Sequence, residues 1–330
     1  MRRCGGYRRR VIPLDVSLTD GIDQLVGVFR DPRILLGIPL ALLGAVFMSF
    51  GAQYQHRGVQ KVERLSGKTT GGLSRSQVTS LLTRPSWVAG TVMLGLAIVC
   101  QLAALSVAPL ILVQPLGAIA LVITTVLNAR VTHHKPTRQS LIAIAACVGG
   151  IFIFVTIAAF FATEHVVTSR ELLIILGILA VVVVVFGVFW FLVRRRAQAL
   201  FYIMAAGVIY GFVATLAKVI ISRIQAGNFE WLTLLCVVAL LAAVGVGAYF
   251  VQTAYSVGPP DLVIAGLTVI DPIVAVLIGL SVLGEASTAP AWALIGFVIA
   301  GAIATWGVIQ LTRHHPPVTA DGKPKKPRVH

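Results

Sequence analysis

The chain is built around apolar runs that are long enough to cross a lipid bilayer. The clearest of them is the 22-residue run Leu172–Val193, which Glu171 and Arg194 bracket. As a helix this run would be about 33 Å long at 1.5 Å per residue, against a hydrocarbon core of about 30 Å. Because lipid offers the backbone no hydrogen-bonding partners, a run of this kind predicts a transmembrane helix.

Nine such runs follow one another along the sequence, and the composition agrees with them. Hydrophobic residues make up 57% of the chain and charged residues 12%, which is about half of the ~25% charged residues usual in soluble domains. We therefore predict an all-α, polytopic membrane protein with about nine transmembrane helices. The runs are Ile34–Gln55, Ser86–Val107, Leu110–Ala129, Gln139–Phe161, Leu172–Val193, Ala199–Ile221, Trp231–Ala254, Leu262–Leu283 and Ala291–Leu311.

Basic residues are unevenly distributed among the predicted loops. Twelve Lys or Arg residues fall in the loops after the first, third and fifth predicted helices, whereas the loops of the opposite side hold Arg170 and Arg223. The positive-inside rule then places the C-terminus in the cytoplasm and the N-terminus outside. The basic N-terminal tail, residues 1–33, conflicts with this orientation, and it lacks the apolar run of a secretory signal. The basic C-terminal tail, residues 313–330, is expected to be disordered.

Two segments 150 residues apart resemble each other, which predicts an internal repeat. Ala104-Leu-Ser-Val-Ala-Pro109 recurs as Ala254-Tyr-Ser-Val-Gly-Pro259, each time between two predicted helices. An odd number of helices separates the two segments, so the units have opposite topology. The first unit, residues 34–161, has four helices and the second, residues 162–312, has five. Inverted repeats are typical of secondary transporters with a site between the halves. Candidate helix breaks or hinges are Pro109, Pro115, Pro259 and Pro272.

Asp271 lies near the middle of the predicted helix Leu262–Leu283, where an ionisable group is costly. Such a group costs about 2.5–3.5 kcal/mol on insertion scales and usually marks an ion or substrate pathway. Pro272 removes a backbone hydrogen bond at the same depth, which favours a broken-helix binding site. We predict that Asp271 binds a cation, such as a metal ion, or a coupling proton. The alternative is a protonated carboxyl that hydrogen-bonds across helices and stiffens their packing.

Other polar residues inside the predicted helices are candidate substrate contacts. Those of the third helix share about one helical face, and another lies one turn before Asp271. Helix packing through amide and hydroxyl hydrogen bonds is the alternative interpretation for each of them. They are Gln101 in the second helix, Gln114, Thr125 and Asn128 in the third, and Thr268 in the eighth.

Lys218, in the predicted helix Ala199–Ile221, is a further candidate with two interpretations. Its side chain can extend to the membrane interface beside Arg223. Alternatively it lies in the cavity and neutralises Asp271, in which case an anionic or zwitterionic substrate becomes easier to accept than a bare cation. The sequence leaves both interpretations open.

The segment Ala103-Ala-Leu-Ser-Val-Ala-Pro-Leu-Ile-Leu-Val-Gln-Pro-Leu-Gly-Ala118 resembles the signature of the NIPA-like branch of the drug/metabolite transporter superfamily. Leu262–Glu285 is similar to the EamA-type helix of that superfamily. The resemblance covers about residues 34–312 and implies nine or ten helices, inverted repeats and, as in characterised NIPA relatives, magnesium transport. Where that family usually carries a glutamate in its second helix, this chain has Ile98 with Gln101 nearby, which leaves Asp271 as the acid deep in the membrane.

These features predict a secondary transporter that moves a cation or a small metabolite across the plasma membrane by alternating access. The sequence has no nucleophile elbow, phosphate-binding glycine loop or paired acids at helical spacing, so we expect neither an enzyme nor a cofactor. The basic tails lack a nucleic-acid-binding pattern, so the expected partners are the bilayer and the substrate. The alternatives are a non-transporting membrane subunit and a partner in lipid or envelope metabolism. A homodimer stays open.

Overall fold

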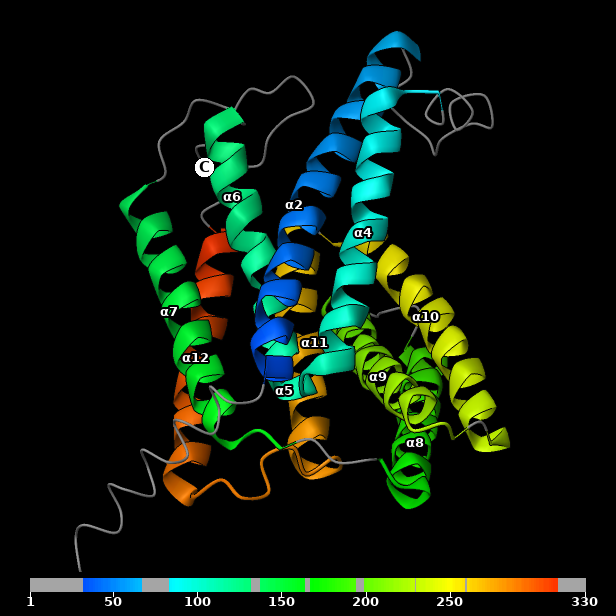
Figure 1. Cartoon of the computed structure of the whole chain (residues 1–330). Coiled ribbons are helices and arrows are strands. Elements are labelled where there is room, and N and C mark those ends of the chain that lie inside the picture. Colours follow the sequence, from blue (N-terminus) through cyan, green and yellow to red (C-terminus); the bar gives the residue numbers. More distant parts are fainter. Residues whose placement is uncertain are drawn as a thin grey trace, which may run out of the picture.

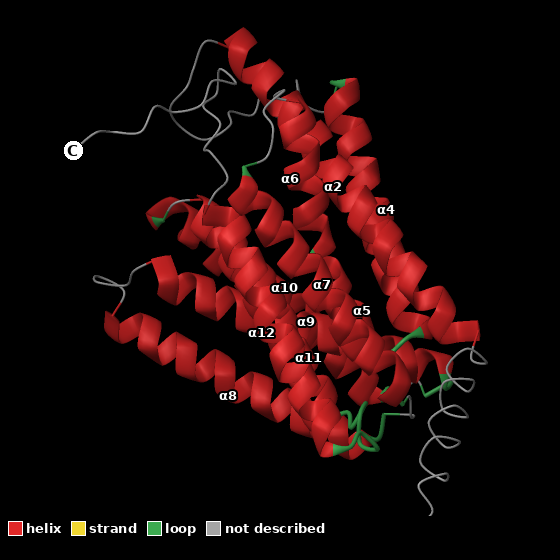
Figure 2. Cartoon of the chain, turned by 90° about the vertical axis from the view of Figure 1, so that its left-hand side faces the viewer, coloured by secondary structure: helices red, strands yellow, loops and turns green. Residues whose placement is uncertain are grey.

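The computed structural model describes residues 32–66, 83–131, 137–163, 167–193, 199–228, 230–258 and 260–313. Within these ranges the chain forms helices and no strand (Figures 1 and 2). Nine helical segments of the described ranges are long and apolar enough to cross a membrane, as the sequence predicts. The helices are α2 (Pro32–Ser66), α4 (Pro85–Val107), α5 (Leu110–Gly117), α6 (Ile119–Val131), α7 (Arg138–Phe161), α8 (Ser169–Val193), α9 (Ala199–Gln225), α10 (Trp231–Val257), α11 (Pro260–Ser281) and α12 (Ala291–Arg313).

The third span is divided into α5 and α6. Pro115 has no backbone N–H to donate to the preceding turn, which weakens the helix at this point. The chain then tightens, because the N–H of Ala118 donates to the carbonyl oxygen of Pro115 at 3.2 Å, three residues back. The interruption therefore falls at Ala118, close after the proline that the sequence analysis marks as a helix break.

The eighth span, α11, is a continuous helix, whereas the sequence analysis expects a break at Pro272. α11 remains helical from Pro260 to Ser281, through Asp271 and Pro272. The broken helix expected at Pro272 is thus not found. An internal proline removes one hydrogen bond, and neighbouring helices and local adjustments can compensate for that loss inside a bundle.

The two halves of the chain repeat the same pairings of helices. α2 packs along α4 in the first half, and α9 packs along α10 in the second (Figure 1). In each half the following span, α5 with α6 or α11, packs against the first helix of the pair. Small residues form corresponding close contacts in the two halves. Gly37 of α2 lies against Ala108 at the end of α4, and Gly258 at the end of α10 lies against Ala199 of α9.

The last spans of the two halves, α7 and α12, pack along each other. Gly150 of α7 allows the backbones to approach closely, since a Cβ atom there would lie 2.6 Å from the backbone nitrogen of Ala304 and 2.8 Å from the carbonyl oxygen of Ala300. Phe154 and Phe297 stack beside this contact with ring centroids 4.8 Å apart. Small residues in transmembrane helices commonly support such approaches.

α8 has no equivalent in the first half and lies at the edge of the bundle (Figures 1 and 2). It packs on α9 and more weakly on α10. Large apolar side chains such as Val181, Val184 and Leu192 are exposed along it. These exposed side chains are suited to contact with lipid, which explains why α8 is uniformly apolar rather than amphipathic.

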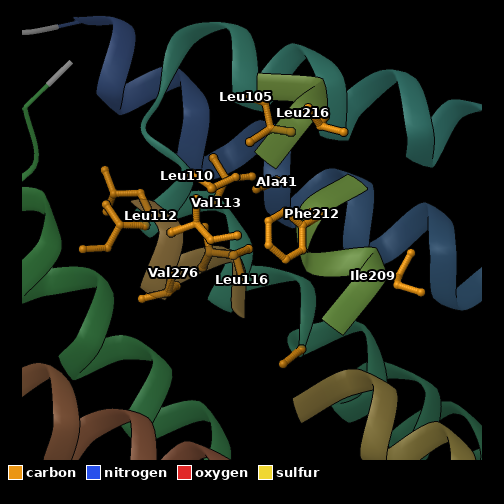
Figure 3. Close-up of a cluster of buried hydrophobic side chains, with 14 of the residues drawn as sticks. Ala41, Leu105, Leu110, Leu112, Val113, Leu116, Ile209, Phe212, Leu216 and Val276 are labelled. Carbon is orange, nitrogen blue, oxygen red and sulfur yellow. The ribbon is translucent and has the colours of Figure 1, made fainter. Parts of the chain in front are cut away.

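The core of the molecule lies where α2, α4, α5, α9 and α11 meet. Figure 3 shows side chains from all five helices, among them Leu105, Val113, Phe212 and Val276, directed toward one another. Every residue of α5 from Leu110 to Gln114 is buried. α5 is therefore the central element, and the polar groups at its ends must find partners inside the protein.

Candidate functional site

Asp271 lies on α11 beside the tight contact between α11 and α9. Two glycines of α9 form this contact: Gly207 lies against Ile270, and Gly211 against Val274 and the carbonyl oxygen of Asp271. A Cβ atom at either glycine would come within 2.7 Å of an α11 side chain. The glycines thus bring α9 close to α11 at the depth of Asp271.

The carboxyl group of Asp271 is incompletely satisfied. Its Oδ1 is the one buried side-chain oxygen or nitrogen without a hydrogen-bond partner in the part of the chain that the structure describes. Tyr210 of α9 lies within electrostatic range of the carboxyl group. Buried polar atoms in proteins are almost always hydrogen-bonded, and an exception requires an explanation such as a ligand or an ion. This atom is the strongest single indication of a binding site.

A cavity of about 390 Å³ lies next to Asp271, between α5, α7, α11 and α12. Its wall is mainly apolar and includes Pro115 of the first half and Pro272 of the second. Thr268 and Thr305 also line it, but Asp271 does not. The carboxyl group lies on the α9 side of α11, and the cavity lies on the α12 side.

Gln114 and Thr268 lie on helices that contact each other across the two halves. Gln114 is buried in α5, which packs directly on α11. The Thr268 hydroxyl donates to the carbonyl oxygen of Ile264 in its own helix at 2.8 Å. Of the sequence-predicted residues of the first half, Gln114 is thus the one whose helix has a substantial contact with α11 in the described ranges.

The remaining candidates lie further from α11. The Thr125 hydroxyl donates to Leu121 within α6 at 2.8 Å, and Asn128 lies in α6 with a side chain outside the described residues. Gln101 is partly buried on α4, whose main partner is α2. Neither α4 nor α6 has a substantial contact with α11 in the described ranges. Ile98 is 61% exposed on the outside of α4, so a carboxylate there would face lipid.

Lys218 hydrogen-bonds to backbone groups of the first half, contacts that neither interpretation of the sequence includes. Its side chain is buried, and its ammonium group donates to the carbonyl oxygens of Leu105 and Ala108, both at 2.8 Å. These carbonyls end α4, where the unpaired C=O groups carry partial negative charge. Neither of these two bonds involves Asp271 or Arg223.

Glu285 is a buried acid that the sequence analysis does not name as a site residue. It is 4% exposed, and its carboxylate accepts hydrogen bonds from the N–H groups of Leu110 and Ile111, both at 2.8 Å. The carboxylate therefore caps the N-terminus of α5, where it is stabilised by the free N–H groups and the helix dipole. Pro109, the N-cap residue of α5, has no side-chain acceptor of its own. A buried helix start without its own capping side chain needs an acceptor from elsewhere in the fold, and this was the available sequence signal for such a residue.

The proline hinges of the sequence analysis fall in different surroundings. Pro109 is buried in the α4–α5 junction, and Pro115 and Pro272 face the same cavity. Pro259 lies outside the described residues. In the described part of the chain no group of three or more His, Cys, Asp or Glu residues is placed to hold a metal ion. Asp271 is thus not part of a cluster of such residues in the described ranges.

The fold is that of a polytopic membrane protein whose halves share their helix pairings and in which Asp271 is buried on α11. A family model for the magnesium transporter NIPA family matches residues 33–226, more than half of the chain. The chain therefore belongs to this family, which is part of the drug/metabolite transporter superfamily.

An uncharacterised protein of Corynebacterium glutamicum is 26% identical over 289 residues, which cover 84% of this chain and 95% of that protein. No solved structure shows a significant match to the chain.

Proposed function

We propose that this protein is a secondary transporter that carries a cation across the plasma membrane by alternating access between residues 34–161 and residues 162–312. The observation that carries the proposal is the buried Oδ1 of Asp271, which lacks a hydrogen-bond partner among the described residues. A carboxylate oxygen that the protein leaves unsatisfied is available to a substrate ion or to a coupling proton.

Several features support two inverted halves with the site between them. The pairs α2/α4 and α9/α10 correspond, and so do the contacts of Gly37 with Ala108 and of Gly258 with Ala199. Asp271 lies on α11, which is in contact with α9 of its own half and α5 of the other. Relative motion of the halves would therefore change the surroundings of the carboxyl group, as alternating access requires.

Magnesium is the substrate that family membership supports. In proteins Mg²⁺ commonly keeps several of its waters and is bound through one or two carboxylates. One acid, Asp271, with the amide of Gln114 on α5, a helix that packs on α11, is compatible with a partly hydrated Mg²⁺. We assign Gln114 as a neutral oxygen ligand and give Thr268, Thr125, Asn128 and Gln101 no direct role in the first contact with the ion.

A small organic cation is the second candidate substrate. The cavity of about 390 Å³ beside Asp271 is largely apolar and carries the hydroxyls of Thr268 and Thr305. Sites for small organic molecules are typically apolar clefts of this order of size with a few polar groups. Asp271 does not line this cavity, so a metabolite held there would have the two threonine hydroxyls as its polar contacts.

The proposed orientation follows from the basic loops, with the C-terminus in the cytoplasm and the N-terminus outside. The α4–α5 junction then faces the exterior. The plasma-membrane location and a homodimer stay predictions from the sequence.

The deciding experiment is transport by Asp271→Asn in proteoliposomes, measured with Mg²⁺ and with a panel of organic cations at two pH values. The substitution keeps the shape of the side chain and removes its charge. Transport should fall roughly 10- to 100-fold, as expected for the loss of a charged interaction worth about 1.5–3 kcal/mol. Asp271→Glu should retain part of the activity.

Glu171→Gln, at the start of α8 and away from the site, is the matched control and should transport normally. Expression and thermal stability of Asp271→Asn should equal or exceed those of the parent. Full transport by Asp271→Asn, or its failure to fold, would instead favour the alternative of a non-transporting membrane subunit in which Asp271 is a packing residue.

A further inference from the structure

Hydrogen bonds from the second half of the chain converge on the α4–α5 junction of the first half. Three side chains of the second half donate to or accept from backbone groups of residues 105–111. We call this set the junction clamp. Its bonds are Lys218 Nζ to the oxygens of Leu105 and Ala108 (2.8 Å each), Gln225 Nε2 to the oxygen of Ser106 (3.0 Å), and the N–H groups of Leu110 and Ile111 to the Glu285 carboxylate (2.8 Å each).

The charges of the clamp match the helix ends that they contact. The Lys218 ammonium lies at the C-terminus of α4 and the Glu285 carboxylate at the N-terminus of α5, so each meets a partial charge of opposite sign. Both side chains are buried, at 8% and 4% exposure. One junction is thus held at both of its helix ends by two residues that are 67 positions apart in the other half.

Side chains of the clamp surround a small cavity. Lys218 and Glu285 line the same small cavity of about 50 Å³, together with Thr163, Ser222 and Gln225. Thr163, which follows α7, donates its N–H to the carbonyl oxygen of Glu285 at 2.7 Å. The residues that line this cavity all belong to the second half, so the contacts that cross to the first half are the five hydrogen bonds to residues 105–111.

We propose that Lys218 and Glu285 are positioning residues that form the gate on the face of the α4–α5 junction, and that the structure shows this gate closed. The proposal rests on the proposed transport by alternating access. In such a cycle contacts between the halves must break on one face while they form on the other. Charged groups suit this role, because water can solvate them, and the helix ends that they release, once the junction opens.

The test measures access from the outside to a cysteine at Thr215, a fully buried residue of α9 about one turn from Lys218, in the full chain with Cys4, Cys100, Cys147 and Cys236 replaced. The rate of labelling by a membrane-impermeant thiol reagent reports how often the junction opens. Glu285→Gln places an N–H group against the N–H groups of α5 and should raise the rate at least about tenfold, the factor expected for one lost charged hydrogen bond. The rate from the cytoplasmic side should not change.

Gly279→Ala tests the same gate without a change of charge. A Cβ atom at Gly279 would lie 2.9 Å from Oε2 of Glu285, so it should displace the carboxylate from α5 and raise labelling as well. Gly177→Ala is the matched control, because no atom lies within 4 Å of its added Cβ atom. It should label at the parent rate.

Parent-like labelling in folded Glu285→Gln and Gly279→Ala would overturn the proposal, and so would a loss of folding in both, which would make the contacts static scaffolding. If Glu285→Gln alone fails to fold, Gly279→Ala decides. The labelling needs no substrate, so its outcome is separate from that of Asp271→Asn. Raised labelling together with unimpaired transport by Asp271→Asn would remove Asp271 from the transport mechanism and leave the gate in place.

Discussion

At the scale of single residues, the charged groups within the helices separate into two kinds. Lys218, Arg223 and Glu285 are buried, and each hydrogen-bonds to backbone or side-chain groups. Asp271 differs from them, because its Oδ1 has no partner in the described part of the chain. Structural charges in a membrane are expected to be paired, whereas a charge left unsatisfied at mid-depth is suited to bind something that arrives and leaves.

Arg223 provides a test of the structural kind. Its side chain is 2% exposed, and it donates from Nε to Thr233 at 2.9 Å and from a terminal nitrogen to Glu230 at 3.0 Å, which ties α9 to α10. Arg223→Ala should lower the free energy of unfolding by about 2 kcal/mol, the scale of a hydrogen bond to a charged group. Thermal unfolding in detergent measures this loss. Arg170→Ala, at an exposed position, should change stability little, and an equal loss in both variants would contradict the role given to the Arg223 contacts.

At the scale of helices, small residues determine how closely two helices approach. α9 reaches α11 through Gly207 and Gly211, and α7 reaches α12 through Gly150. Without a hydrophobic driving force between helices in lipid, such close packing is a main source of association. The position of Asp271 beside α9 therefore depends on residues that carry no chemistry of their own.

Two adjacent glycines of α7 allow a matched comparison. Gly150→Ala would place a Cβ atom 2.6 Å from the backbone of Ala304, whereas the added Cβ atom of Gly149→Ala meets nothing within 4 Å. We expect Gly150→Ala to lower the free energy of unfolding by about 1–3 kcal/mol through overpacking. Gly149→Ala should raise it by up to about 1 kcal/mol through helix propensity. Thermal unfolding of the two variants side by side measures the difference, and the reverse order would refute the α7–α12 contact.

At the scale of the whole molecule, the described chain has an odd number of spans. The helices of the two halves pair in the same way, and α8 is the single extra span. In the proposed arrangement of two inverted halves, α8 lies between two four-helix units and gives them opposite orientations in the membrane. Corresponding junctions, α4–α5 and α10–α11, then lie at opposite faces, and only the first can belong to the external gate that we propose.

Orientation can be measured directly with single cysteines in a chain that lacks the four native ones. A cysteine between residues 66 and 80, in the basic loop before α4, should react with an impermeant thiol reagent from the cytoplasm only, because basic loops stay inside. Ala226→Cys, in the exposed turn after α9, is the control and should react from the outside. External labelling of residues 66–80 would contradict either the nine-helix count or the orientation.

The number and type of the helices could be predicted from the sequence because they depend on local properties. A run of about 20 apolar residues is long enough to cross the bilayer wherever it packs, and the acid at position 271 is conspicuous inside such a run. The family resemblance of Ala103–Ala118 is equally local, and the family match confirms it.

The partners of the charged residues were decided by the tertiary structure alone. Glu285 caps a helix 175 residues away, and Lys218 binds carbonyl groups 113 and 110 residues away. Those partners are backbone groups, which every residue carries, so no pattern of side chains in the sequence predicts them. The two prolines differ for a related reason. The helix breaks after Pro115 but continues through Pro272. Which of these happens depends on whether the surrounding helices satisfy or displace the freed backbone groups, and that is a property of the packed bundle.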